Sequence, residues 1–124
     1  LGWIGRDDIN AIGERADIGL MAYRPGKNYE MSMPNKFGEY LALSTAIALR
    51  PSGIMKETVT KTACGFHYEN GEELASQISL LVQNRSHLSE MQKNARKLYE
   101  STFNSDEVYR AMAVHVLNDF TSRK

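Results

Sequence analysis

Short apolar runs, each bounded by polar or turn-forming residues, divide the first two thirds of the chain. Continuous apolar runs of this length are typical of strands that are buried on both faces of a parallel sheet. We therefore expect strands over residues 17–23, 45–49 and 65–68, and the last residues of a further strand over 1–4. Residues 50–53 have the composition of a turn, and the Pro- and Gly-containing residues 24–36 predict a loop.

Apolar residues at helical spacing occupy the segments between these runs. We expect a first helix that is capped by Asp7 or Asp8 and carries Ile9, Ile12 and Ala16 on one face, followed by helices over 37–43 and 54–62. In the last third, apolar positions mark three successive helices: Leu74, Ile78, Leu81 and Val82; Leu88, Met91, Ala95, Leu98 and Tyr99; and Val108, Ala111, Met112, Val116 and Phe120. We expect the last of these helices to begin at Ser105.

Strands that alternate with helices predict an α/β fold with a parallel, Rossmann-like sheet, here followed by a helical C-terminal tail. So few and such short strands make a thin sheet. The chain also opens at Leu1 without a methionine. We therefore expect it to be a fragment that is truncated on the N-terminal side of the sheet.

Composition narrows the class of protein further. The 124 residues are enough for one domain, residues 1–124, with a single core. Lys+Arg and Asp+Glu balance at 15 each, so no long-range field favours nucleic acid or an anionic membrane. The only cysteine, Cys64, excludes an internal disulfide and is expected to be a small buried residue. No apolar run approaches the roughly 20 residues that span a bilayer, and no signal peptide is visible.

The most informative segment is Pro34-Asn35-Lys36-Phe37-Gly38-Glu39-Tyr40-Leu41-Ala42. A polar loop leads there into a helix start, with Glu39 expected inside the first turn. A helix start offers unpaired N–H groups and a partial positive charge, which suit a phosphate or diphosphate. A carboxylate can accept two hydrogen bonds from a sugar diol. The alternative is that Glu39 only complements the helix dipole.

The order of these signals resembles the C-terminal half-domain of a GT-B glycosyltransferase of the retaining, family-4-like group. The family's Met-x-x-Asn-Ala-Arg helix matches residues 91–96 at each specified position, and its Glu-Glu-Leu-Ala helix matches residues 72–75. The resemblance covers nearly the whole chain. The other matching segments are Leu1-Gly2-Trp3-Ile4, Ala16-Asp17-Ile18, Glu39-Tyr40-Leu41-Ala42, Ser44-Thr45-Ala46-Ile47-Ala48, Gly53 and Gly65-Phe66-His67-Tyr68.

The resemblance implies a role for each matching residue of the donor site. Glu39 is expected to bind the ribose hydroxyls of a nucleotide-diphosphate sugar, and the backbone amides of Asn35 and Lys36 are expected to contact its diphosphate. Many members carry a second glutamate eight positions earlier, where this chain has Met31, with Glu30 one residue away. The remaining matches are Gly2, Trp3 and Ile4 at the nucleobase and Ser32 and Met33 at the donor sugar.

The resemblance also implies glycosyl transfer with retention of anomeric configuration, without a metal ion or another cofactor. The acceptor, a glycan or a lipid-linked glycan of polysaccharide biosynthesis, would bind an N-terminal domain of the same enzyme that this chain lacks. The isolated chain is therefore expected to be inactive. The full-length enzyme would be cytoplasmic or peripheral at the inner face of the membrane.

Other interpretations stay open on the residues alone. They are a non-catalytic flavodoxin-like interaction domain and a fragment of a GT-B nucleotide-sugar 2-epimerase. The Lys36 side chain can be an ordinary exposed lysine, and Trp3 can be a core residue instead of a stacking platform. His67, His87 and His115 are too far apart in the sequence to show metal-ligand spacing. The last helix is apolar on a broad face, so it is expected to pack on its own domain or on another copy in a homodimer.

Overall fold

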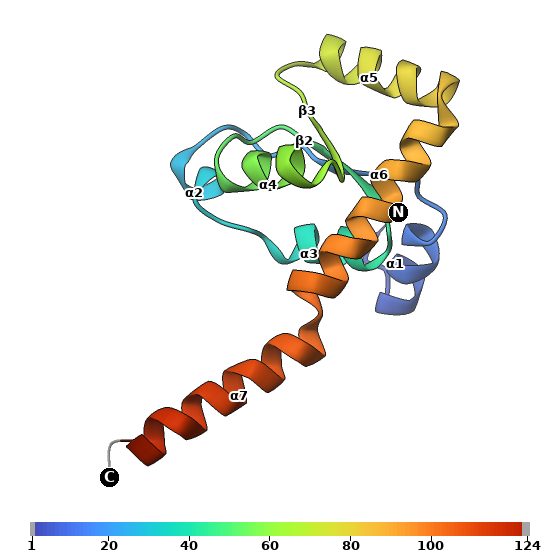
Figure 1. The fold of residues 1–124 in the computed structure, drawn as a ribbon. Helices are drawn as coiled ribbons and strands as arrows, with labels where there is room; N and C mark the ends of the chain where they lie inside the picture. Colours follow the sequence, from blue (N-terminus) through green and yellow to red (C-terminus); the bar gives the residue numbers. More distant parts are fainter. Residues whose placement is uncertain (1, 123–124) are drawn as a thin grey trace.

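A computed structural model describes residues 2–122 (Figure 1). Its centre is a three-stranded parallel sheet in the order β1-β2-β3. The strands are β1 (Ile18–Met21), β2 (Ala46–Leu49) and β3 (Gly65–His67). All four residues of β2 are buried, as expected for the middle strand of a sheet that is covered on both faces. The α/β class, the parallel sheet and the helical C-terminal region predicted from the sequence are confirmed.

Helices fill both connections between the strands. The helices are α1 (Arg6–Gly13), α2 (Lys27–Glu30), α3 (Asn35–Ala42), α4 (Ile54–Thr62), α5 (Gly71–Gln83), α6 (Arg85–Leu98) and α7 (Ser105–Ser122), with a π-helical segment, η1 (Tyr99–Phe103), between α6 and α7. The predicted loop over 24–36 therefore contains a short helix, α2, and the first two residues of α3. The helix predicted over 54–62 is confirmed, and its first and last residues are the predicted ones.

Alternate residues of β2 supply the two halves of the core. Ile47 and Leu49 pack with Phe37 and Leu41 of α3 on one face, and Met55 of α4 completes that contact. Ala46 and Ala48 point to the other face, because side chains alternate along a strand. They pack there with Phe66, Leu81, Leu88 and Met91, which come from β3, α5 and α6. This double cover holds α3 in a defined position beside the sheet.

Polar side chains of α6 bind the ends of three other elements. The side-chain amide of Gln92 donates to the Asp17 carbonyl before β1 (3.2 Å), and that of Asn94 donates to the Ala63 carbonyl after α4 (3.3 Å). Arg96 donates to the Ala42 carbonyl at the end of α3 (3.0 Å). These three residues belong to the segment 91–96 that carried the sequence resemblance. Their observed role is to satisfy backbone carbonyl groups that end a helix or lead into a strand.

The N-terminal segment differs from its prediction. Residues 2–4 form no strand, and Leu1 lies outside the described residues. Gly5 is the residue that precedes α1, and Asp8 lies in the first turn, where its carboxylate accepts from the Gly5 amide at 3.3 Å. Ile9 and Ile12 are 47% and 50% exposed. The apolar face of α1 is therefore present but not buried, and Ile9 and Ile12 border an open groove together with Tyr40 of α3.

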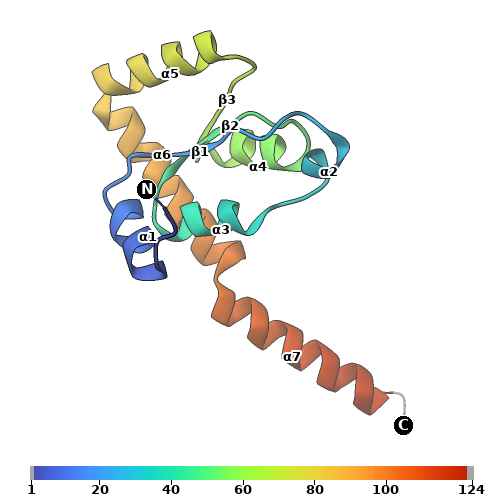
Figure 2. The same ribbon diagram turned by 180° about the vertical axis from the view of Figure 1, so that it is seen from behind.

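The last helix, α7, extends away from the sheet (Figures 1 and 2). None of its residues from Ser105 to Ser122 is buried. It therefore does not pack on its own domain, which was one of the two arrangements expected from its broad apolar face. Among residues 2–122, no helix has the length and apolar character needed to cross a membrane.

Candidate functional site

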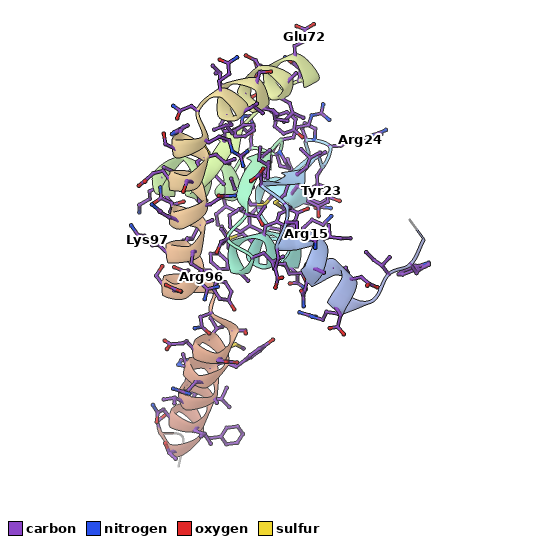
Figure 3. The ribbon with its side chains drawn as sticks, turned by 90° about the vertical axis from the view of Figure 1, so that its right-hand side faces the viewer. Arg15, Tyr23, Arg24, Glu72, Arg96 and Lys97 are labelled. Atoms are coloured by element: carbon purple, nitrogen blue, oxygen red, sulfur yellow. The ribbon has the colours of Figure 1, made fainter. Side chains whose placement is uncertain are left out.

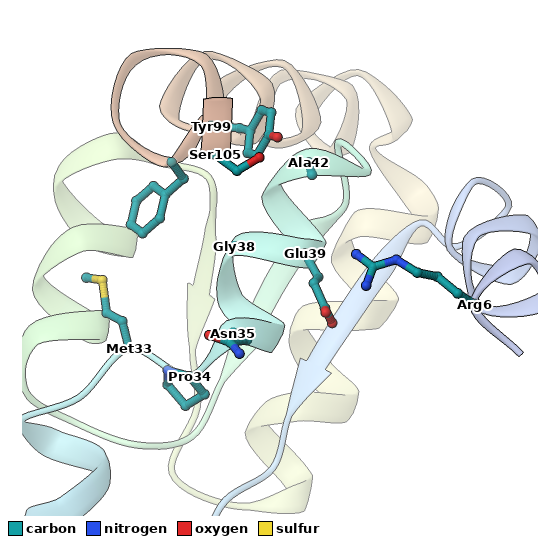
Figure 4. A pocket seen from close by; sticks show the side chains of 10 residues that line it. Arg6, Met33, Pro34, Asn35, Gly38, Glu39, Ala42, Tyr99 and Ser105 are labelled. Carbon is teal, nitrogen blue, oxygen red and sulfur yellow. The ribbon is translucent and has the colours of Figure 1, made fainter. Parts of the chain in front are cut away.

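A groove of about 310 Å³ lies beside α3 (Figure 4). We call it the α3 groove. The residues that line it belong to α1, to the loop before α3, to α3 itself, to η1 and to the first residue of α7. Its lining residues are Arg6, Met33, Pro34, Asn35, Gly38, Glu39, Ala42, Tyr99, Phe103 and Ser105.

The start of α3 is one wall of this groove. Pro34 precedes the helix in an extended conformation (φ −59°, ψ 151°), and it has no N–H group to donate. The amides of Asn35 and Lys36 have no acceptor within α3, because the first N–H groups of a helix lack a preceding turn. The amide of Phe37 donates to the Pro34 carbonyl at 2.9 Å. Burial of Phe37 and Leu41 fixes the rotation of the helix, so that its other side faces the groove.

Glu39 occupies a different place in the helix from the one predicted. Because α3 begins at Asn35, two residues earlier than expected, Glu39 lies in the second turn, and the first turn holds no acidic residue. This weakens the interpretation that Glu39 only complements the helix dipole, since that effect falls off within the first turn. The Glu39 carboxylate is exposed and points away from α3 into the groove (Figure 4).

Arg6 faces Glu39 across the groove (Figure 4). It is the first residue of α1, and its guanidinium points from there toward α3. Sequence reasoning did not select Arg6, because an isolated arginine at a helix start carries no motif. Only the position of α1 near α3 in the tertiary structure brings this permanent positive charge to the groove. A guanidinium, an unpaired helix-start amide at Asn35 and a carboxylate in one groove can together bind a phosphate that carries a hydroxyl-rich group.

A second, mostly apolar groove of about 410 Å³ lies on the other side of Glu39. We call it the α1–α3 groove. Its walls include Ile4, Lys36 and Tyr40, so it brings Ile4 together with Lys36 and Glu39. Thr45 also lines the α1–α3 groove. Its hydroxyl is buried and has no hydrogen-bond partner among residues 2–122.

The structure separates Gly2, Trp3 and Ser32 from these grooves. Trp3 is 105% exposed, so it is not the core residue considered as one alternative, and it lines neither groove. Gly2 lines neither groove, and a Cβ atom there would meet nothing within 4 Å. Ser32 is exposed and lies outside both. Met33 does line the α3 groove and also packs against the core. Met31, at the place of the missing glutamate, is 83% exposed.

The titratable groups with shifted pKa values lie away from the α3 groove. Burial raises the pKa of the Cys64 thiol, although a hydrogen bond from the Thr62 hydroxyl (3.2 Å) opposes the shift. Burial also raises the pKa of Tyr68. The Nε2 atom of His67 lies 2.9 Å from the Arg50 carbonyl oxygen, and this contact ties the end of β3 to the residue after β2. The side chains of Cys64, Tyr68 and His67 therefore contribute to the packing and hydrogen bonding of the fold beside the sheet.

No protein-family model, curated protein or solved structure matches this chain.

Proposed function

We propose that this chain is the donor-binding part of a retaining glycosyltransferase of the GT-B, family-4-like group. The observation that carries the proposal is the composition of the α3 groove. It joins the unpaired helix-start amide of Asn35, the Glu39 carboxylate and the Arg6 guanidinium in one concave site. These groups correspond to the two polar halves of a nucleotide-diphosphate sugar.

The diphosphate binds at the start of α3 in this proposal. The amides of Asn35 and Lys36 donate to its oxygens, and Arg6 adds a positive charge and further donors from the facing wall. A guanidinium bonded to phosphate forms a charge-assisted pair, which is about twice as strong as a neutral hydrogen bond. The same groups stabilise the negative charge that develops on the departing nucleotide diphosphate.

The ribose binds at Glu39. An ionised carboxylate accepts hydrogen bonds from two adjacent hydroxyl groups, so it distinguishes a sugar diol from a lone phosphate. The nucleobase extends from there into the apolar α1–α3 groove, next to Ile4 and Tyr40. The sugar that is transferred lies on the Met33 side of the α3 groove. Acceptor binding and the rest of the catalytic machinery belong, in the proposed parent enzyme, to another domain.

Titration calorimetry with UDP and with GDP tests this proposal. We expect one of the two nucleotides to bind and the Glu39→Gln variant to bind it at least tenfold more weakly, because the neutral amide loses the charge-assisted bonds to the diol. Glu57→Gln is the matched control, since Glu57 is an exposed residue of α4 that lines neither groove. Equal affinity of the Glu39→Gln variant and the unchanged chain would remove the ribose assignment.

A non-catalytic interaction domain is the second candidate. The exposed apolar residues of α7 favour it, because an uncovered apolar helix is typical of a surface that binds another protein. If neither nucleotide binds, even to a version of the chain that is extended at its N-terminus, the interaction domain becomes the better description.

A further inference from the structure

Thr45 lines the α1–α3 groove, and its buried hydroxyl group has no hydrogen-bond partner among residues 2–122. The residue is 1% exposed, so bulk water does not take the place of that partner. A buried hydroxyl without a hydrogen bond destabilises a folded chain, because it loses its hydration and gains nothing in return. Such exceptions to hydrogen-bond pairing are expected at functional sites, and a ligand in the groove can supply the missing partner.

Thr45 lies beside the last turn of α3, where its backbone amide donates to the Tyr40 carbonyl at 2.9 Å. Asn35 begins this helix, and Glu39 follows it about 6 Å further along the axis. The C-terminal end of α3 lies about another 6 Å beyond Glu39. The order Asn35, Glu39, Thr45 along the helix therefore matches the order phosphate, ribose, base in a nucleoside diphosphate.

The other polar side chains that line the α1–α3 groove have a partner or a different place in the proposed site. Lys36 and Glu39 lie nearer the start of α3, where the diphosphate and the ribose bind in the proposal. The Tyr40 hydroxyl donates to the Leu20 carbonyl at 3.4 Å. The remaining lining residues are isoleucine, leucine, alanine and glycine. Thr45 therefore supplies the side-chain group of this groove that is available to a nucleobase.

We propose that Thr45 determines which nucleobase the donor site accepts, and that this base is uracil. The inference rests on the proposed function, which assigns the groove to the base of a nucleoside diphosphate. The Thr45 hydroxyl rotates to suit its partner and can donate to a carbonyl oxygen of uracil. Guanine carries an amino group and the N7 acceptor as well as its carbonyl, and these extra groups would lie against apolar lining without partners. The groove therefore favours UDP over GDP.

Titration calorimetry with UDP and GDP on a set of threonine variants tests the proposal. We expect the unchanged chain to bind UDP about tenfold more tightly than GDP. Thr45→Val, which replaces the hydroxyl with a methyl group of similar size, should bind UDP roughly fivefold more weakly. Thr45→Ser keeps the hydroxyl and should stay within about twofold of the unchanged chain. Thr58→Val is the matched control, because the Thr58 hydroxyl donates to the Ile54 carbonyl at 2.8 Å and the residue lines neither groove.

Urea unfolding of the ligand-free variants separates a role in binding from a purely structural one. If the Thr45 hydroxyl lacks a partner in the free chain, Thr45→Val removes an unsatisfied group and should raise the urea midpoint. Higher stability together with weaker UDP binding is the result that supports the proposal. A lower midpoint would show that the hydroxyl is already satisfied, for example by a buried water, and would contradict the proposal.

Failure of this inference is distinguishable from failure of the proposed function. If UDP binds and Glu39→Gln weakens its binding but Thr45→Val does not, the role given to Thr45 is wrong and the proposed function stands. Tighter binding of GDP than of UDP would likewise overturn the choice of uracil alone. If neither nucleotide binds, even to a version of the chain that is extended at its N-terminus, the proposed function and the role of Thr45 are both overturned.

Discussion

The guanidinium of Arg96 donates to the carbonyl oxygen of Ala42 at 3.0 Å and so joins α6 to the last residue of α3. The same guanidinium pairs with Glu100 at 2.7 Å and lies 5.5 Å from the centre of the Tyr99 ring. Ala42 and Tyr99 both line the α3 groove. Arg96 therefore positions two walls of that groove from outside it, and it does so across 54 residues of sequence.

The first prediction concerns this contact. Arg96→Ala should lower the free energy of unfolding by about 1–2 kcal/mol, because the Ala42 carbonyl loses a charged donor at the C-terminal end of α3. Urea unfolding followed by circular dichroism measures the change. Lys97→Ala is the control, since Lys97 is exposed on the same helix (Figure 3) and should change stability by less than about 0.5 kcal/mol. Equal losses in the two variants would refute the role given to Arg96.

The second prediction concerns Gly19. A Cβ atom at this position of β1 would lie 2.5 Å from Cδ2 of the Tyr40 ring, and the Tyr40 hydroxyl donates to the Leu20 carbonyl at 3.4 Å. Gly19→Ala should therefore destabilise the protein by about 1–3 kcal/mol through overpacking. The cost should fall when Tyr40→Ala is present as well, and a double-mutant cycle measures the difference.

Gly71 provides the matched control for that cycle. A Cβ atom there would meet nothing within 4 Å, and the residue begins α5. Gly71→Ala should leave stability unchanged or raise it slightly, because alanine has less conformational freedom in the unfolded chain. If Gly19→Ala costs the same with and without the Tyr40 ring, the proposed clash is not the cause.

The third prediction is a pH dependence from Cys64. Burial raises the pKa of this thiol above its ordinary value of 9.0, so the folded state holds the proton more tightly than the unfolded state. Between the two pKa values the unfolded state binds fewer protons, and stability must fall as the pH rises above about 9. Cys64→Ser should flatten this slope in urea unfolding at several pH values. Tyr68, whose pKa is also raised from 10.0, adds its own loss at higher pH. An unchanged slope in Cys64→Ser between about pH 8.5 and 10 would contradict the assignment.

The fourth prediction separates Arg6 from Glu39 in the proposed site. Arg6→Ala should weaken binding of the preferred nucleoside diphosphate roughly tenfold and leave binding of the nucleoside alone unchanged, because only the phosphates interact with the guanidinium. Arg15→Ala is the control with the same change in charge, since Arg15 is exposed and lines neither groove. Calorimetry gives both affinities. A similar loss in Arg15→Ala would show that overall charge, and not a contact at the groove, sets the affinity.

Local pattern predicted the strands and most helices because neighbouring residues determine them. The apolar runs around Ile18, Ile47 and Phe66 are strands, and the helix over 54–62 has the predicted ends. The pattern failed at residues 2–4, where an apolar run forms no strand. A short apolar run becomes a strand only when another strand pairs with it, and no partner lies beside residues 2–4 in the described chain.

The candidate site was predictable only in part. The start of α3 and Glu39 follow from the segment 34–42. Arg6 could not be predicted, because its place in the groove depends on where α1 lies relative to α3. The helix begins two residues earlier than predicted, so Glu39 lies in its second turn and not in its first. Residues 91–96 were expected to be helical. That Arg96 binds the end of α3 depends on contacts that no local pattern encodes.

The sequence by itself determined the α/β class, the buried strands and the amphipathic character of α6 and α7, since side-chain spacing along each element sets which face is apolar. The tertiary structure decided which of these faces are covered. Met91 and Ala95 of α6 are buried against the sheet, whereas the equally apolar Val116 and Phe120 of α7 remain exposed. The tertiary structure also decided that Arg6 and Glu39 face the same groove. Spacing along a chain cannot settle either point, because both depend on how elements that are distant in sequence pack together.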